Sequence, residues 1–130
     1  MDIKKFAEKY VKAHEEAILT GNCDALEELE DSDIVEHIIS SSRDMEGWEA
    51  HKQHILEVRQ ALSDINMDCE ILISEGNLFA ILYKVRGRFT GQIPGMPPPT
   101  SKEIEASTLG LFHVSNGKVY EAWAHVTPQV

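Results

Sequence analysis

The sequence predicts an α+β fold in which three amino-terminal helices pack on a strongly curved antiparallel sheet. Apolar residues recur at three- and four-residue spacing up to about residue 63, which is typical of amphipathic helices. From residue 65 onward they alternate with polar residues, as in half-buried strands, and no crossover helix separates the runs. Asn116-Gly117 stands between two such runs and is a strong hairpin signal. A bent sheet folded around helices leaves a conical interior, where we expect a pocket.

The composition favours a single globular domain that binds neither nucleic acid nor membranes. The 130 residues fit one domain spanning residues 1–130. With 22 acidic and 12 basic side chains the formal charge is -10, so nucleic-acid phosphates and anionic membrane surfaces would be repelled. No apolar run approaches the ~20 residues of a membrane span, and the amino-terminal residues lack the apolar core of a signal peptide. Cys23 and Cys69 lack paired-ligand spacing, and two reduced thiols favour a cytoplasmic location.

The amino-terminal half is expected to hold the helices. The first is expected from about Asp2 to Thr20, where Gly21 ends it, and a short second helix follows up to about Glu30. The first helix has one inner face, made by Ile3, Phe6, Tyr10, His14, Ala17 and Ile18. Residues 31–45 are expected to be irregular. Asp44 is expected to cap a third helix, from about residue 46 to 63, whose apolar face carries Trp48, His51, Ile55, Val58 and Leu62.

Four long strands are expected in the second half. They cover residues 65–73, 79–89, 104–114 and 119–126, and Gly87 is expected to mark a bulge or bend in the second of them. A proline-rich segment, residues 91–102, joins the second strand to the third. Because proline fixes φ, we expect this segment, with Met96, to form a stiff lip of the pocket.

The hairpin turn also predicts which side chains share a face. If Asn116-Gly117 is a two-residue loop, Ser115 pairs with Lys118 and the register follows. One face then carries Ala106, Thr108, Gly110, Phe112, Trp123 and His125, although a bulge near the turn would reverse the last two. The other face carries Leu109, Leu111, His113, Tyr120, Ala122, Ala124 and Val126. Both faces are rich in apolar residues, so the sheet needs two covers, and we expect a homodimer through the outer one.

Several segments together resemble the SnoaL-like polyketide cyclase family. The loop from Gly91 to Lys102 and the hairpin end from Gly117 to Trp123 are similar to its G-x-x-x-G-x-P-P-T-G-K and G-K-I-x-E-x-W motifs. Glu46–His51 and Gly21-Asn22 resemble the family's E-G and G-D segments. The resemblance implies the α+β cone of the nuclear-transport-factor-like superfamily. That fold hosts cyclases, isomerases, dehydratases, epoxide hydrolases and binding modules, so the resemblance is weaker for activity than for fold.

The resemblance also suggests site residues. It implies that the hairpin face with Ala106, Thr108, Gly110 and Phe112 is the inner one, so Trp123 and His125 are expected to face inward with them. Residues 31–37 resemble the segment that delivers the aspartate base of the superfamily's ketosteroid isomerases, and His37 takes that place. His14 falls where those enzymes keep an oxyanion-binding tyrosine, and Gly110 falls near their second oxyanion donor, which is therefore missing. Many SnoaL-like sequences carry an acidic or histidine side chain beside the terminal tryptophan. Here Ala122 and Ala124 flank Trp123, which counts against the family's acid/base chemistry.

These residues predict cofactor-free acid/base chemistry on a small apolar carbonyl compound. His37 would abstract a proton next to the carbonyl, because an imidazole with a pKa of about 6.5 is a suitable base near neutrality. His14 would hydrogen-bond the enolate. The expected substrate-binding residues are Tyr10, Trp48, His51, Met96, Thr108, Phe112, Trp123 and His125.

Two other functions stay open. One is a binding module that shields an apolar ligand without chemistry, which Gly110, Ala122 and Ala124 favour because they supply no acid/base group. The alternative role of His37 is a loop histidine bonded to the backbone, and that of His14 and of Trp48 is a core residue. The other is an epoxide or ester hydrolase, for which Glu36, Glu105 and Glu121 are the candidate carboxylates.

Neither a metal nor a cofactor is expected. His51 and His54 are three residues apart, whereas a helical metal pair usually has i, i+4 spacing and needs a third ligand. The glycines at positions 91 and 95 follow a strand but open no helix, which argues against a dinucleotide site.

Overall fold

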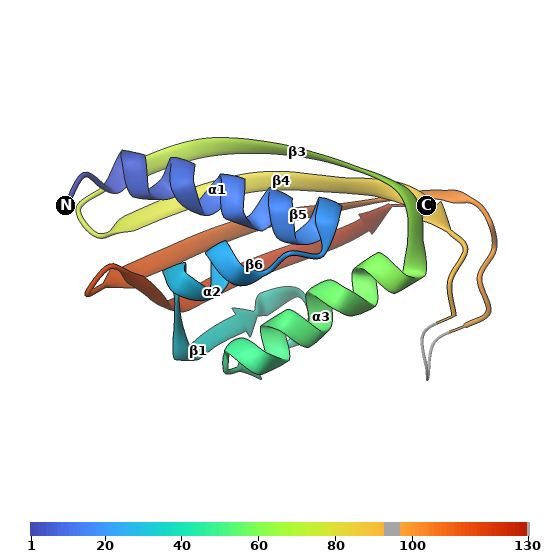
Figure 1. Cartoon of the computed structure of the whole chain (residues 1–130), viewed down its shortest axis with the longest axis horizontal. Coiled ribbons are helices and arrows are strands. Elements are labelled where there is room, and N and C mark those ends of the chain that lie inside the picture. Colours follow the sequence, from blue (N-terminus) through green and yellow to red (C-terminus); the bar gives the residue numbers. More distant parts are fainter. Residues whose placement is uncertain (93–96, 130) are drawn as a thin grey trace.

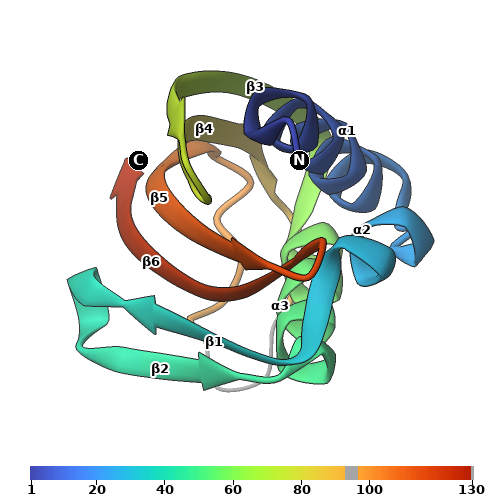
Figure 2. The ribbon, with the colours of Figure 1, turned by 90° about the vertical axis from the view of Figure 1, so that its left-hand side faces the viewer.

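A six-stranded sheet curves around the helices in the computed structural model, which describes residues 1–92 and 97–129. The elements in chain order are α1 (Ile3–Thr20), α2 (Asp24–Leu29), β1 (Glu30–Ile38), η1 (Ile39–Ser41), β2 (Arg43–Glu46), α3 (Trp48–Ala61), β3 (Leu62–Glu75), β4 (Leu78–Phe89), β5 (Glu103–Ser115) and β6 (Lys118–Gln129). The strand order is β2-β1-β6-β5-β4-β3, and only the β1–β6 pair is parallel. Figures 1 and 2 show α1 and α3 along the concave side of the sheet. The predicted fold class is confirmed.

The segment predicted to be irregular contains two strands. β1 pairs in parallel with β6 and antiparallel with the short β2, so residues 30–46 extend the sheet. The turn between β1 and β2 is made by η1 and by Ser42, whose φ is 54°. Asp44 lies in β2, and the residue that precedes α3 is Gly47, with φ 89°. The prediction was wrong because β1 is stabilised by pairing with a strand far away in the sequence, and local composition carries no signal of that.

The bulge predicted at Gly87 lies in the partner strand. The β3–β4 register shifts between Ser63 and Asn66, where Asp64 has a φ of 52°. Glycine is needed at position 87 because the β3 backbone passes close to it: a Cβ there would lie 3.0 Å from the carbonyl oxygen of Ser63. A second shift, between Ile71 and Ile73, leaves Ile73 57% exposed.

The β5–β6 hairpin has the predicted turn and an additional bulge. Asn116 and Gly117 have φ values of 54° and 74°, and Ser115 pairs with Lys118. The register then shifts between His113 and Val114, so that Trp123 pairs with Leu111 and His125 with Leu109. The prediction that Trp123 and His125 face inward was therefore wrong, for the reason that an unpaired residue reverses the alternation beyond it.

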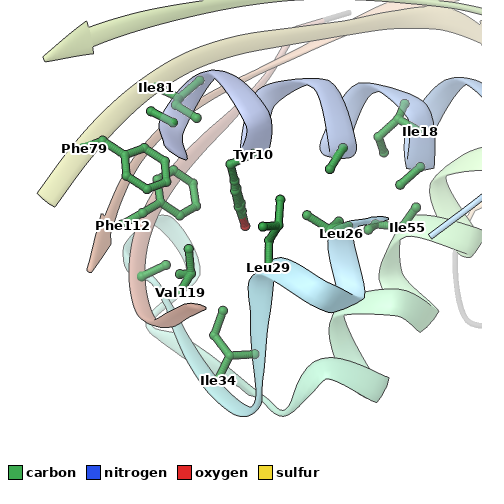
Figure 3. Close-up of a cluster of buried hydrophobic side chains, with 14 of the residues drawn as sticks. Tyr10, Ile18, Leu26, Leu29, Ile34, Ile55, Phe79, Ile81, Phe112 and Val119 are labelled. Carbon is green, nitrogen blue, oxygen red and sulfur yellow. The ribbon is translucent and has the colours of Figure 1, made fainter. Parts of the chain in front are cut away.

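The core lies between α1, α2 and the concave face of the sheet (Figure 3). The rings of Phe79 and Phe112 stack with centroids 5.0 Å apart, and Tyr10 lies 5.1 Å from Phe112. Trp48 is also buried. Tyr10, Trp48 and Phe112, which we predicted to bind substrate, thus serve the core. Within the described chain, no helix is long and apolar enough to cross a membrane.

Candidate functional site

A cavity of about 330 Å³ lies between α1, α3 and the concave face of the sheet. Most of its wall is apolar and comes from Ile18, Ile38, Met45, Ile55, Val58, Ala61, Leu62, Val85, Phe89, Ile104, Ala106 and Val126. Six polar side chains complete it: His14, Glu36, His51, His54, Tyr83 and Thr108. An apolar cavity with a few converging polar groups is the usual form of a small-molecule site.

Glu36 brings a carboxylate into this apolar wall. Alternation along β1 turns Glu36 and Ile38 toward the cavity. Burial raises the pKa of Glu36, and the nearby His51 partly opposes that rise. Among the described residues its carboxylate has neither a hydrogen-bond partner nor an ion-pair partner. A carboxylate whose pKa is raised by burial is a stronger base than one in water, and this suits it to accept a proton from a substrate.

His51 is held in the wall by a buried carboxylate. Its Nδ1 lies 2.7 Å from Oε1 of Glu30, and the Tyr10 hydroxyl donates to Oε2 of the same residue over 2.6 Å. Burial alone would lower the pKa of His51, but Glu30 outweighs burial and raises that pKa to about 9, with a further contribution from Glu36. His51 is therefore an imidazolium at neutral pH, and Nε2 is its second donor nitrogen.

His14 lies beside His51 and is neutral, whereas His51 carries a positive charge. The two ring centroids are 5.7 Å apart. Burial, followed by repulsion from His51 and His54, lowers the pKa of His14 to about 3, so this imidazole is neutral. Its Nδ1 is buried with no hydrogen-bond partner in the described chain. An unfilled lone pair costs less than an orphaned N–H, so the proton is expected on Nε2.

Two hydroxyls complete the polar part of the wall. The Tyr83 ring lies 5.1 Å from that of His14, and Thr108 lines the cavity with it. Burial, with the negative charge of Glu36, raises the pKa of Tyr83 far above its ordinary value. Tyr83 therefore stays a phenol and can donate a hydrogen bond.

His37 lies on the opposite face of the sheet and does not line the cavity. Its Nδ1 is 2.9 Å from Oδ1 of Asp44, its Nε2 is 2.8 Å from Oε2 of Glu121, and its ring lies 5.6 Å from Trp123. The hydrogen bonds to Glu121 and Asp44 raise the pKa of His37. The prediction that His37 and His14 share a cavity was wrong. Consecutive residues of a strand point to opposite faces, so Glu36 faces the cavity that His14 lines and His37 faces away from it.

The structure thus brings together part of the predicted site. His14, His51 and Thr108 line the cavity, whereas His37, Trp123 and His125 do not. Met96 lies outside the described residues.

Three residues of the site were missed. Tyr83 and Glu30 were not proposed, and Glu36 was considered only for a hydrolase. Assigning residues 30–38 to a strand would have identified Glu36 as the inward neighbour of His37. No local signal points to Glu30. Across the described chain, no group of three or more His, Cys, Asp or Glu residues is arranged to hold a metal ion.

The family model described as SnoaL-like polyketide cyclase matches residues 8–127. The chain belongs to this family. No protein among the curated sequences matches it.

Solved structures of the same fold agree with this assignment. A protein described as a SnoaL-like polyketide cyclase from Jannaschia sp. CCS1 superposes with a TM-score of 0.80 at 18% identity, over 97% of this chain and 88% of that one. IdmH from Streptomyces antibioticus, described as a polyketide cyclase, gives 0.74 at 20% identity, over 92% and 90%. An NTF-2 like protein from Burkholderia xenovorans LB400 gives 0.67 at 18% identity, over 96% and 85%. At these identities the similarity establishes the fold only, so the reaction has to be inferred from the residues of the site.

Proposed function

We propose that this SnoaL-like protein removes a proton from the carbon next to a carbonyl group of a small apolar compound, with Glu36 as the base. The observation that carries the proposal is an accessible carboxylate of raised pKa in the same apolar cavity as an imidazolium. In this cavity the base and the electrophile are separate side chains, and environment assigns their roles.

The steps follow from these two groups. Glu36 takes the proton, and the electron pair of the C–H bond moves into an enolate. The Nε2–H of His51 donates a hydrogen bond to the developing enolate oxygen, and the low dielectric of the cavity strengthens that bond. The neutral His14 and the phenol of Tyr83 are further donors. Where the substrate has a β,γ double bond, the enolate is a dienolate and the proton returns from Glu36 to the γ carbon, which isomerises the substrate. Otherwise the enolate carbon attacks a second carbonyl of the same molecule and the new alkoxide takes the proton from Glu36, which closes a ring.

The substrate class follows from the wall of the cavity. A volume of about 330 Å³ is at the lower end of the ~300–1,000 Å³ typical of ligand pockets. The predominance of aliphatic side chains favours an uncharged, largely apolar molecule. His51 and Glu30 neutralise each other, so Glu36 is the remaining negative charge and disfavours anionic substrates.

Isotope exchange tests the proposal. Polyketide-like, steroid-like and terpenoid carbonyl compounds are screened by NMR in D₂O for α-proton exchange, with native protein and with Glu36→Gln. The variant is expected to lose about 10²–10⁴-fold in exchange rate. His37→Ala is the matched control, because it removes the neighbouring residue on the other face, and its exchange rate is expected to stay native. Native exchange in Glu36→Gln would rule out Glu36 as the base.

A binding module without chemistry is the second candidate. It is favoured by Gly110, Ala122 and Ala124, which leave the inner face of β5 and β6 without the acid/base groups found elsewhere in the family. Binding of a compound without exchange, unaffected by Glu36→Gln, would establish this function instead.

We also propose a homodimer through the outer face of the sheet. Leu109, Leu111 and Leu78 are 50%, 39% and 38% exposed there, next to Ile73. A second copy presents the same apolar patch, and isologous pairing would bury both patches at once. Sedimentation should give twice the monomer mass, and Leu109→Lys should restore the monomer. A native monomer at high concentration would contradict the proposal.

A further inference from the structure

Glu30 makes a buried connection between two helices and the sheet. It begins β1 directly after α2 and is 1% exposed. One carboxylate oxygen accepts from Tyr10 on α1 and the other faces Nδ1 of His51 on α3. Figure 3 shows Tyr10 extending from α1 toward Leu29, the residue that precedes Glu30. Both oxygens of Glu30 thus have partners that come from distant parts of the chain.

Stability alone is a poor reason for this arrangement. A buried ion pair often contributes no more stability than apolar residues of the same volume, because removing both charges from water is costly. The surrounding core, with Phe79, Phe112 and Leu26, is apolar and would accommodate such residues. We therefore expect an effect of this polar connection on the part of His51 that lines the cavity.

The contacts of His51 hold its ring in one orientation. Nδ1 is bound to Glu30, the Trp48 ring meets the imidazole edge-on at 89° with centroids 5.8 Å apart, and His14 lies on another side. Nε2 has no hydrogen-bond partner within the described residues, and the ring lines the cavity. Nε2 is consequently the nitrogen left to meet a ligand.

We propose that Glu30, itself oriented by Tyr10, is a positioning residue that keeps His51 doubly protonated with its Nε2–H directed into the cavity. The proposal rests on the proposed function for its catalytic meaning, since Glu30 acts on the substrate only through His51. It assigns Glu30 and Tyr10 a part in the reaction although neither lines the cavity.

Several titratable groups besides Glu30 face His51. Glu36 on β1 also favours the protonated ring, whereas burial opposes it. Burial and then the charge of His51 lower the pKa of His54 on α3. His14 on α1 is neutral, and Tyr83 on β4 stays protonated, so neither adds a charge. Glu30 is the only one of these groups that hydrogen-bonds His51. Its removal is therefore expected to change the charge of His51 most.

Ring-nitrogen NMR of the histidines in the native protein is the first test. His51 is expected to stay doubly protonated through neutral pH and to lose a proton at about pH 9, while His14 stays neutral. A native His51 that titrates like a free imidazole, at about pH 6.5, would overturn the proposal without any variant.

Glu30→Gln then tests the effect of the carboxylate. In the folded variant, His51 is expected to be neutral at pH 7 and to lose its fixed Nδ1–H signal, and kcat for exchange should fall about 10–100-fold with little change in KM. A His51 that remains protonated, or an unchanged kcat, would contradict the proposal. Tyr10→Phe keeps the ring and removes one hydroxyl, so it offers a milder variant in which kcat should fall several-fold.

The outcomes separate this proposal from the proposed function. If His51 titrates as expected and depends on Glu30, but Glu36→Gln leaves exchange unchanged, the positioning of His51 stands and the role of Glu36 fails. If Glu36→Gln abolishes exchange while Glu30→Gln has native kcat, the role of Glu36 stands and the positioning role of Glu30 is wrong.

Discussion

Glu36 and His37 are adjacent in β1 and have opposite surroundings. Glu36 faces the concave side, where burial raises its pKa and no partner neutralises it within the described chain. His37 faces the convex side between two carboxylates, with its side chain 30% exposed. The comparison shows that the face of the sheet, more than the residue type, decides which group is available for chemistry.

The two histidine–carboxylate sites make the same point. The contacts have similar lengths, 2.7 Å for His51 with Glu30 and 2.8 Å for His37 with Glu121. The side chain of Glu30 is 0% exposed, whereas that of Glu121 is 34% exposed. Water and salt screen the outer pair, so equal geometry is expected to have unequal energetic consequences.

The largest expected difference is between Glu30→Ala and Glu121→Ala. Glu30→Ala leaves Tyr10 and His51 buried without their partner and should lower the free energy of unfolding by about 3–5 kcal/mol. Glu121→Ala removes a screened contact and should cost about 0–1 kcal/mol. Urea denaturation of both variants measures the difference. Equal losses would mean that burial does not distinguish the two sites.

An intermediate effect is expected from the inner and outer faces of β5. A Cβ at Gly110 would lie 2.7 Å from two atoms of the Phe112 ring, which stacks on Phe79, so Gly110→Ala should cost about 1–3 kcal/mol through overpacking. Ser107→Ala on the outer face should stay within about 0.5 kcal/mol. Thermal unfolding compares the two. A neutral Gly110→Ala would mean that the core relaxes around the added methyl group.

The smallest effect is expected in the pH dependence of the outer site. Because hydrogen bonds raise the pKa of His37 in the folded protein, its stabilising effect is full below about pH 6.5 and is lost as pH rises through the raised value. His37→Gln should therefore reduce the fall in unfolding free energy between about pH 6 and about pH 8, by less than about 1 kcal/mol. The contribution of His51 is lost only as pH rises through about 9 and should persist in this variant. An identical pH profile for native protein and variant would contradict the assignment.

The sequence by itself determined the fold class, the family and the Asn116-Gly117 turn. These depend on local information: apolar periodicity, positive φ in a tight turn and short motifs. His14, His51 and Thr108 were also found. Spacing predicts the inner helix faces that carry the two histidines, whereas the family resemblance put Thr108 on the inner face of its strand.

Tertiary structure alone decided the rest of the site. β1 is defined by its parallel pairing with β6, so residues 30–38 carry little local signal, and without that strand His37 could not be told from Glu36. The shift between His113 and Val114 turned Trp123 and His125 to the outer face, because one unpaired residue reverses every side chain that follows. Glu30 meets His51 and Tyr10 across 21 and 20 residues of sequence. Such contacts depend on how the helices dock on the sheet, and that docking is a property of the whole core.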